Sequence, residues 1–393
     1  MGMISDRFGR KTSMMIALLL HIAACIGTAF ATSFLVFTSL RFFVGVSNMG
    51  IFLSAYVLGL ELVGDRVRTL CGSLFMMFWC FGLFIETGVA YGLRTWWHLQ
   101  LAMASPTVLF LSYIWLVEES PRWMLNKNKL TEVNDLLQKL AKINGRPTPP
   151  SVYGLEKPKG ENPLRMFTNR VTLVRTLIIF LNWMVVTLVY YGLSLNVGNI
   201  GTNIYLSFFM SAMAELLGYL LSSLLLDRVG RKTMYCGSMI FSGLACLATM
   251  FPVIYDAQYK KVIILVLSNV GKMGASSAYA IIYLFSAELF PTVARNSLLG
   301  ISCTIGHLGG VISPYISQLT VIVGGKLGVA LPLVVMGGPG LGASLLALLL
   351  PETLHRKLPE TVEDAINFGK KAYSKNITNF EHENQAFDDP LNE

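Results

Sequence analysis

The sequence is short of charge and of polar surface. Only 14% of its 393 residues are Asp, Glu, Lys or Arg, whereas a soluble domain is about one quarter charged. A mean hydropathy of +0.57 leaves too few polar side chains to cover a water-soluble protein of this length. The sequence also lacks a Gly-rich nucleotide loop, a P-loop, a catalytic triad pattern and a cluster of metal ligands. We therefore expect neither an enzyme nor an ATP-driven pump, and no cofactor or metal.

Cysteine is also scarce, and its spacing excludes a disulfide scaffold or a zinc site. The six cysteines lie in apolar runs or at their edges, without the paired spacing that either site requires. We interpret them as small buried apolar side chains. They are Cys25, Cys71, Cys80, Cys236, Cys246 and Cys303.

Long apolar runs dominate the chain instead. Ten of them are about 20 residues long, the length of helix that crosses roughly 30 Å of hydrocarbon. They are continuous and do not alternate, so helices are expected and not barrel strands. The runs lie near residues 12–31, 39–60, 69–93, 99–117, 172–192, 204–226, 233–252, 261–285, 298–318 and 329–350. The sequence predicts an all-α, multi-pass membrane protein embedded in a lipid bilayer.

The basic residues gather on one side of the predicted spans. The chain carries 31 Lys and Arg against 23 Asp and Glu, a formal net charge of +8. With a cytoplasmic N-terminus, most basic side chains fall in cytoplasmic connections, and the outer connections hold only Arg94, Lys260, Lys261 and Lys326. The excess is thus a topology signal, and no nucleic acid partner is expected. We predict cytoplasmic termini and a location in the plasma membrane.

The connections divide the chain into four parts. They are four spans at 1–117, a polar cytoplasmic segment at 118–171, six spans at 172–350 and a cytoplasmic tail at 351–393. In the polar segment, Pro121 can open a helix, and apolar residues recur at helical spacing over 130–143. In the tail, Thr361 and the acids after it are typical of a helix start. Short amphipathic helices are expected at both places.

Three short motifs occur twice in the same order. Asp-Arg-x-Gly-Arg-Lys at 6–11 recurs at 227–232. A Glu and an Arg seven residues apart, at 61 and 68, recur at 288 and 295. A Glu followed by a hydroxyl residue, at 119, recurs at 352. Such repetition indicates two copies of one bundle. Positive-inside signals alone would explain the arginines but not the acids.

We interpret these charges as a cytoplasmic gate. Ion pairs between helices can close the inner side of a two-bundle transporter and must break when it opens inward. The candidate gate residues are Asp6, Arg7, Arg10, Glu61, Arg68, Glu119, Arg122, Asp227, Arg228, Arg231, Glu288, Arg295 and Glu352.

The paired loops resemble the signature of the major facilitator superfamily, which has twelve helices in two pseudo-symmetric bundles. Residues 119–123 resemble a motif of the sugar porters and of the organic cation, anion and zwitterion transporter family. The second family is favoured by the segments at 189–193, 271–274, 287–296, 350–353 and 358–365. The tail and the region of Glu215 are most similar to its organic cation and carnitine branches.

The resemblance implies a departure at the start of the chain. In that family the first Asp-Arg loop joins the second and third helices, whereas here it begins at residue 6. The ten predicted spans would then correspond to family helices three to twelve. The chain is expected to be either a truncated isoform or an incomplete gene model.

Ionisable side chains inside spans cost roughly 2.5–3.5 kcal/mol each on insertion scales, so each requires an explanation. Glu215, at a position that resembles one implicated in cation transport, either binds cations or makes a structural hydrogen bond. Lys272, beside small glycines, either pairs with Glu215 as a gate or anion subsite, or snorkels. Glu86 either attracts cations or points outward.

His307 occupies a position where similar cation carriers have an aspartate, and anion or carnitine carriers an arginine. A histidine is neutral or cationic near neutral pH, so this site neither demands a cation nor excludes a zwitterion. The alternative is a histidine that only packs. If His307 lies in the substrate path, uptake should depend on pH.

Aromatic rings inside spans could hold an organic cation over their faces. Packing and interfacial anchoring are the alternative roles. The candidates are Phe52, Tyr56, Trp79, Trp183, Tyr190, Tyr191 and Tyr279, of which Tyr190 has the strongest claim because the resemblance places it on a cavity-lining helix.

We therefore expect a secondary transporter that moves small organic cations or zwitterions, such as carnitine-like or amine compounds, by alternating access. Two alternatives stay open: a truncated membrane protein that no longer transports, and a transporter of organic anions or sugars.

Overall fold

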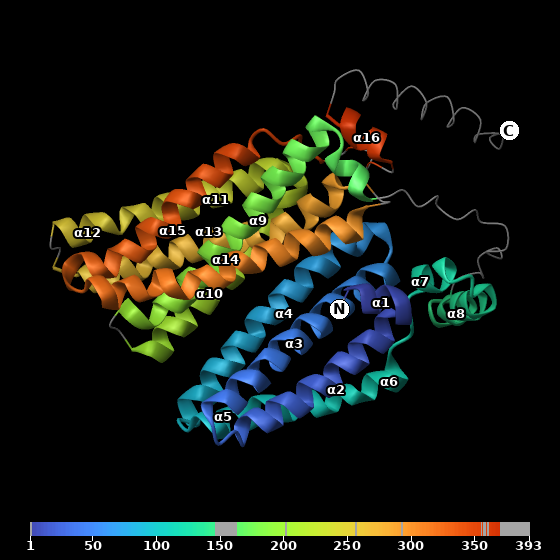
Figure 1. Cartoon of the computed structure of the whole chain (residues 1–393), viewed down its shortest axis with the longest axis horizontal. Coiled ribbons are helices and arrows are strands. Elements are labelled where there is room, and N and C mark those ends of the chain that lie inside the picture. Colours follow the sequence, from blue (N-terminus) through green and yellow to red (C-terminus); the bar gives the residue numbers. More distant parts are fainter. Residues whose placement is uncertain are drawn as a thin grey trace. The chain divides into compact units, whose positions relative to one another are not determined.

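Every element that the computed structural model describes is helical (Figure 1). The described residues are 2–145, 163–200, 203–255, 258–291, 294–354, 356, 359 and 361–369. Within them, ten helical segments are long and apolar enough to cross a membrane, and each agrees with one of the ten apolar runs of the sequence to within a few residues. The expectation of an all-α, multi-pass membrane protein is confirmed.

The chain divides into two compact units, Met1–Pro158 and Lys159–Glu393, here called the first and the second unit. The division falls inside the polar segment at 118–171. Four of the candidate spans belong to the first unit and six to the second.

The first unit is built on two long helices that pack along each other, α2 and α3. Met14, Met15 and Leu18 of α2 are buried and contact Ile51 and Ala55 of α3. The elements are α1 (Gly2–Phe8), α2 (Arg10–Ala29), α3 (Phe34–Leu62), α4 (Asp65–Gly92), α5 (Trp96–Ala104), η1 (Ser105–Ser112), α6 (Tyr113–Leu116), α7 (Pro121–Asn126) and α8 (Leu130–Ile143).

The fourth span is not one regular helix. The apolar run at 99–117 predicts a continuous α-helix, but the chain passes from α5 into the 3₁₀-helix η1 and then into α6. Pro106 lies in the first turn of η1. Its ring and its missing N–H disfavour continuation of the α-helical hydrogen bonds, and the tighter 3₁₀ turn follows.

A helix pair follows the fourth span. The Ser120 hydroxyl accepts a hydrogen bond from the Trp123 backbone N–H and thereby caps α7. Trp123 and Met124 of α7 pack against Val133 and Leu136 of α8. α7 therefore covers most of the apolar face that the sequence predicts for 130–143, whereas Ile143 at its end is exposed.

The second unit has a larger buried core. Trp183, Tyr235, Met239, Phe285 and Leu333, from four different helices, are each at most 2% exposed. The elements are η2 (Pro163–Phe167), α9 (Arg170–Asn196), η3 (Val197–Ile200), α10 (Ile204–Val229), α11 (Arg231–Ala248), α12 (Met250–Ile254), α13 (Lys260–Leu289), α14 (Arg295–Val323), α15 (Gly325–Ala347) and α16 (Val362–Asn367).

The short tail helix α16 is fixed to the start of α9. Arg175 donates hydrogen bonds to the backbone carbonyls of Ala365, at 2.8 Å, and Phe368, at 3.0 Å. Thr361 and Asp364 form a reciprocal capping box at the other end of α16. Arg175 thus satisfies carbonyl groups that the end of this short helix leaves without intrahelical partners.

Candidate functional site

A buried ion pair lies inside the second unit. The Lys272 Nζ of α13 is 3.3 Å from the Glu215 Oε2 of α10, and the two side chains are 3% and 1% exposed. A charge in an apolar interior is tolerated only with a partner and with further hydrogen bonds. The pair explains why both residues occur in apolar spans.

Two tyrosines complete the environment of the carboxylate. The hydroxyls of Tyr190 and Tyr219 donate to Glu215 Oε1 at 2.5 and 2.9 Å. The Lys272 ammonium donates to the Ser194 hydroxyl and to the Tyr190 backbone carbonyl. It also lies 3.3 Å from the centre of the Tyr190 ring, a cation–π geometry. We call these five residues the Glu215 cluster.

Small residues bring the helices of the cluster together. A Cβ atom at Gly218 would lie 2.5 Å from the Met273 carbonyl oxygen, so only glycine fits where α10 crosses α13. The Ser277 hydroxyl donates to the Gly218 carbonyl at 2.8 Å across the same crossing. Gly218 is one helical turn from Glu215, and Met273 is next to Lys272, so this contact sets the distance between the two charges.

The aromatic candidates of the second unit form a continuous group around the cluster. Tyr190 stacks on Tyr279, with ring centres 4.9 Å apart, and meets Tyr191 edge-on at 5.2 Å. Trp183 meets Tyr283 edge-on at 4.5 Å and lies 6.4 Å from Tyr279. The sequence did not single out Tyr283. These five rings form one connected aromatic group, which reaches the Glu215 carboxylate through Tyr190.

His307 lies apart from this hydrogen-bonded cluster. It is half-buried on α14, the helix that packs on α9 through Gly306 and Gly310. These two glycines approach Trp183, Thr187 and Tyr191 of α9. Within the part of the chain that the structure describes, the His307 imidazole makes no hydrogen bond or ion pair.

The candidate substrate-binding residues of the first unit are less buried than those of the second, and their contacts are between aromatic rings. Phe52 and Tyr56 stack on each other with ring centres 5.9 Å apart, and Tyr56 meets Phe75 edge-on at 5.6 Å. Trp79 is 41% exposed, and Glu86 is exposed, in contrast to the buried Glu215.

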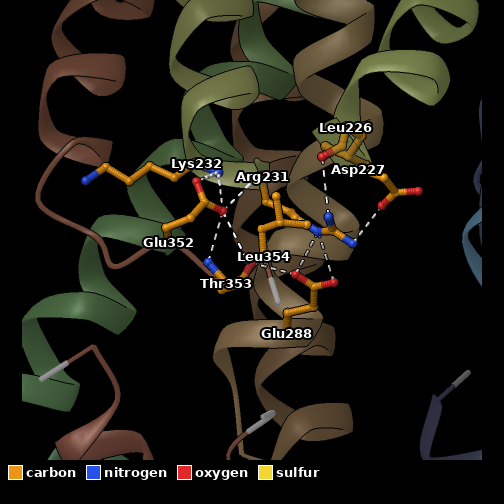
Figure 2. A network of polar contacts seen from close by, with 8 residues as sticks. All are labelled: Leu226, Asp227, Arg231, Lys232, Glu288, Glu352, Thr353 and Leu354. Carbon is orange, nitrogen blue, oxygen red and sulfur yellow. Dashed lines mark hydrogen bonds and ion pairs between the residues drawn. The ribbon is translucent and has the colours of Figure 1, made fainter. Parts of the chain in front are cut away.

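A second polar assembly surrounds Arg231 at the start of α11 (Figure 2). Its Nε lies 3.2 Å from Glu288 Oε2, its Nη2 lies 3.0 Å from Asp227 Oδ1, and its Nη1 donates to the Leu226 carbonyl. The Thr353 hydroxyl donates to the same Glu288 carboxylate at 2.5 Å. The Arg231 guanidinium therefore links α11 to α10 and α13, and Glu288 extends the network to the chain after α15.

Glu352 binds the beginning of α11. Its carboxylate accepts hydrogen bonds from the backbone N–H groups of Arg231 and Lys232, and from those of Thr353 and Leu354 (Figure 2). Burial alone would raise the pKa of Glu352, but these four donors together hold the pKa below its ordinary value. A carboxylate at a helix N-terminus is also favoured by the helix dipole.

Among the side chains that the structure describes, the first unit repeats the contacts of this assembly with Glu288, Leu226 and Thr353. The Arg10 Nε lies 3.2 Å from Glu61 Oε2, and its Nη1 donates to the carbonyl of Ser5, five residues earlier, as Arg231 does to Leu226. The Ser120 hydroxyl donates to Glu61 as Thr353 does to Glu288. We call the two assemblies the arginine networks.

Glu119 completes the network of the first unit. It accepts from the backbone N–H groups of Arg10 at 2.8 Å, Lys11 at 3.1 Å and Ser120 at 3.0 Å. All three contacts have counterparts around Glu352. The repeat that the sequence indicates is therefore also a repeat of contacts.

The remaining gate candidates either lie outside the arginine networks or have side chains that are not among those described. Arg7, Arg122 and Arg228 are exposed, and Arg295 donates to the Phe290 carbonyl. The side chains of Asp6 and Arg68 are not among those described. Glu61 and Glu288 contact Arg10 and Arg231, the second arginine of each Asp-Arg-x-Gly-Arg-Lys loop, and not the arginine seven residues after them.

Sequence reasoning missed several partners. Tyr219 lies four residues after Glu215, on the same helix face, so its position was a usable signal. Ser194 is likewise four residues after Tyr190. Ser286, which accepts from the Trp183 indole N–H at 2.8 Å, and the hydroxyls of Ser120 and Thr353 gave no signal by spacing.

Comparison with known proteins agrees with this architecture. The model of the sugar (and other) transporter family matches residues 1–364. The organic cation transporter protein of Drosophila melanogaster is 37% identical over 385 residues, which cover 94% of this chain and 69% of the relative. Solute carrier family 22 member 2 of Homo sapiens is 36% identical over 381 residues, covering 95% and 67%.

A solved structure has the same fold. The xylose transporter XylE from E. coli, in a partially occluded inward-open conformation, matches with a TM-score of 0.67 at 18% identity, over 91% of this chain and 84% of that chain. The fold is that of a multi-pass helical transporter of the major facilitator superfamily. Within that superfamily, the chain belongs to the sugar (and other) transporter family.

Proposed function

We propose that the protein is a secondary transporter of small organic cations or zwitterions in the plasma membrane, with both termini in the cytoplasm. The observation that carries the proposal is the Glu215 cluster, where a buried carboxylate and the face of Tyr190 hold one ammonium group. The Drosophila melanogaster relative, which is named an organic cation transporter protein, supports the same substrate class.

Lys272 occupies the two contacts that an organic cation would use. A substrate ammonium needs a carboxylate as counter-charge and an aromatic face to replace water, and Glu215 and Tyr190 are both engaged by Lys272. Substrate would therefore compete with the lysine. Once displaced, the Lys272 ammonium is available for the carboxylate of a zwitterion such as a carnitine-like compound.

The arginine networks are the candidate gate. Arg10 and Arg231 each hold a helix end, a carboxylate from another helix and a backbone carbonyl within one unit. Alternating access needs elements with two discrete arrangements, and such multi-partner guanidinium contacts hold one of them. An Arg231→Lys variant keeps the charge but loses the fork geometry, so we expect slower uptake with unchanged substrate affinity.

The driving force fits a cationic substrate. Each elementary charge gains about 2.3 kcal/mol per 100 mV on moving toward the negative side of a membrane. No coupling ion is then required for accumulation. A net-neutral zwitterion does not gain this energy, so the effect of the potential distinguishes the two substrate classes.

Uptake by purified protein in proteoliposomes tests the proposal. Radiolabelled tetraethylammonium, carnitine, an organic anion and a sugar are offered with and without an inside-negative potential. We expect Glu215→Gln to lower cation uptake roughly tenfold or more, because a charge-assisted contact contributes about 1.5–3 kcal/mol. Lys272→Met should keep cation uptake and lose carnitine uptake.

Glu86→Gln is the matched control, since it removes an exposed carboxylate from another span. It should leave cation uptake unchanged. Uptake of anion or sugar alone would overturn the substrate class. Absence of uptake for all four compounds by correctly folded protein would favour a membrane protein that does not transport.

A further inference from the structure

An amide group without a partner lies one helical turn from the Glu215 cluster. Asn269 of α13 is only 9% exposed, and its Nδ2 is buried. Among the residues that the structure describes, no hydrogen-bond acceptor reaches this nitrogen. A buried amide N–H without an acceptor is costly and uncommon in folded proteins, and a molecule that binds beside it is one way to satisfy it.

Helix geometry directs Asn269 toward α10. In an α-helix, a side chain lies beside the side chains three and four residues further on. Lys272, three residues on, pairs with Glu215 of α10. Met273, four residues on, meets α10 at Gly218. Asn269 therefore lies on the face of α13 that meets α10, one turn nearer the start of α13 than the ion pair.

A buried serine of α10 lies at the same level. α10 and α13 run parallel, because the contacts between them advance along both helices from the ion pair to Gly218 and Ser277. Ser211, one turn before Glu215, is 5% exposed and is thus the residue of α10 at the level of Asn269. Toward the start of both helices, buried polar side chains border the ion pair.

We propose that Asn269 is a specificity-determining residue that, together with Lys272, binds the carboxylate of a zwitterionic substrate. The inference rests on the proposed transport function, in which a substrate ammonium replaces Lys272 at Glu215. The amide N–H of Asn269 and the ammonium of Lys272 are both donors, which is what a carboxylate requires. The buried amide receives its acceptor when such a substrate binds.

This exchange of partners leaves no buried charge alone. Lys272 and Glu215 neutralise each other, and the two side chains are 3% and 1% exposed. A cation that takes the place of Lys272 leaves the lysine without a counter-charge, whereas a zwitterion supplies one with its own carboxylate. An unpaired charge in an apolar interior is strongly unfavourable. We therefore expect the wild-type protein to favour a zwitterion over a cation of similar size.

The separation of the two subsites limits which zwitterions fit. Asn269 is one helical turn from the ion pair, and one turn rises about 5.4 Å. Three methylene groups between the nitrogen and the carboxyl carbon separate these atoms by about 5 Å, whereas one methylene separates them by about 2.5 Å. γ-Butyrobetaine should therefore be preferred to glycine betaine.

Uptake into proteoliposomes tests the inference. γ-Butyrobetaine, glycine betaine and choline carry the same trimethylammonium group, and choline has no carboxylate. The membrane potential is clamped at zero, so that the net charge of a compound does not change its driving force. We expect wild-type protein to take up γ-butyrobetaine faster than either of the other two compounds.

Variants of Asn269 separate the carboxylate subsite from the ammonium subsite. Asn269→Leu removes the donor at similar volume and should lower the ratio of γ-butyrobetaine to choline uptake about 10–100-fold, because a hydrogen bond to a charged group is lost. Asn269→Asp keeps the shape but repels a carboxylate, so the ratio should fall further. Ser268→Ala is the control, since Ser268 is buried about 100° around the axis, beside Gly271, which packs on α11. Its ratio should equal that of the wild type.

The outcomes distinguish this inference from the proposed function. If wild-type protein takes up none of the three compounds, the proposed function is overturned, and this inference with it. Choline uptake with an unchanged ratio in the Asn269 variants overturns this inference alone. If neither variant folds, the wild-type series decides, and a preference for choline over γ-butyrobetaine contradicts the exchange of partners.

Discussion

Glu119 and Glu352 make equivalent contacts in the two halves of the chain. Each accepts hydrogen bonds from the backbone N–H groups of an Arg-Lys pair that opens a long helix. Each Arg-Lys pair directly follows a glycine with a positive φ, because Gly9 and Gly230 have φ values of 105° and 103°. The carboxylates therefore connect the end of each bundle to the start of an earlier helix.

Glu352→Gln should destabilise the second unit by about 1 kcal/mol, since it removes a charged acceptor from a helix N-terminus. Glu119→Gln should do the same in the first unit. The thermal midpoint of purified protein, at a fixed scan rate, measures both effects. Glu118→Gln breaks only an exposed ion pair with Lys139, and its midpoint should stay within error of the wild type.

The contribution of Glu352 should depend on pH. Its pKa in the folded protein is held below the ordinary value by backbone donors, so the ionised form is favoured by folding. The stabilisation is complete above the ordinary carboxyl pKa and is lost as the pH falls through the lowered value. The difference in thermal midpoint between wild type and Glu352→Gln should therefore be constant near neutral pH and shrink in acid. A difference that grows in acid would contradict this assignment.

Gly230→Ala should be strongly destabilising. A residue with a side chain is strained at this φ by roughly 1–3 kcal/mol, and its Cβ would lie 2.7 Å from Glu352 Oε2. Gly237→Ala, further along α11, meets no atom within 4 Å and should be neutral or stabilising. Expression yield and thermal midpoint of the two variants provide the comparison, and equal midpoints would refute the strain argument.

His307→Gln should change the pH dependence of cation uptake while leaving the fold intact. A protonated imidazole in the substrate path repels a cation, so wild-type uptake should rise as the pH rises between about 5 and 8. In the variant this rise should disappear. Initial rates at constant membrane potential across that range are the measurement, and an unchanged profile would show that His307 only packs.

The spans and the repeat could be predicted because both depend on local patterns. Hydropathy over about 20 residues identifies a span whatever its neighbours in the bundle are. The two Asp-Arg-x-Gly-Arg-Lys loops can be recognised by comparing the chain with itself. The interruption of the fourth span could have been anticipated from Pro106. It was missed because an apolar run has the same hydropathy in an α-helix and in a 3₁₀-helix.

The contacts between helices were harder to predict. Sequence spacing associates Glu288 with Arg295, but the structure places Arg231 beside it, because the rotation of α11 against α13 decides which side chains meet. The sequence allowed Lys272 to pair with Glu215 or to snorkel, and only the crossing at Gly218 selects the pair.

The 3₁₀-helix η1 determines the position of Glu119, which follows it in the chain. Eight residues of 3₁₀-helix rise about 16 Å, whereas eight residues of α-helix rise about 12 Å. They also turn about 160° further around the axis, at about 120° instead of 100° per residue. η1 thereby determines how far along the axis α6 and the turn after it begin, and which way their side chains point around that axis. A substitution at Pro106 could misplace the Glu119 carboxylate without touching it.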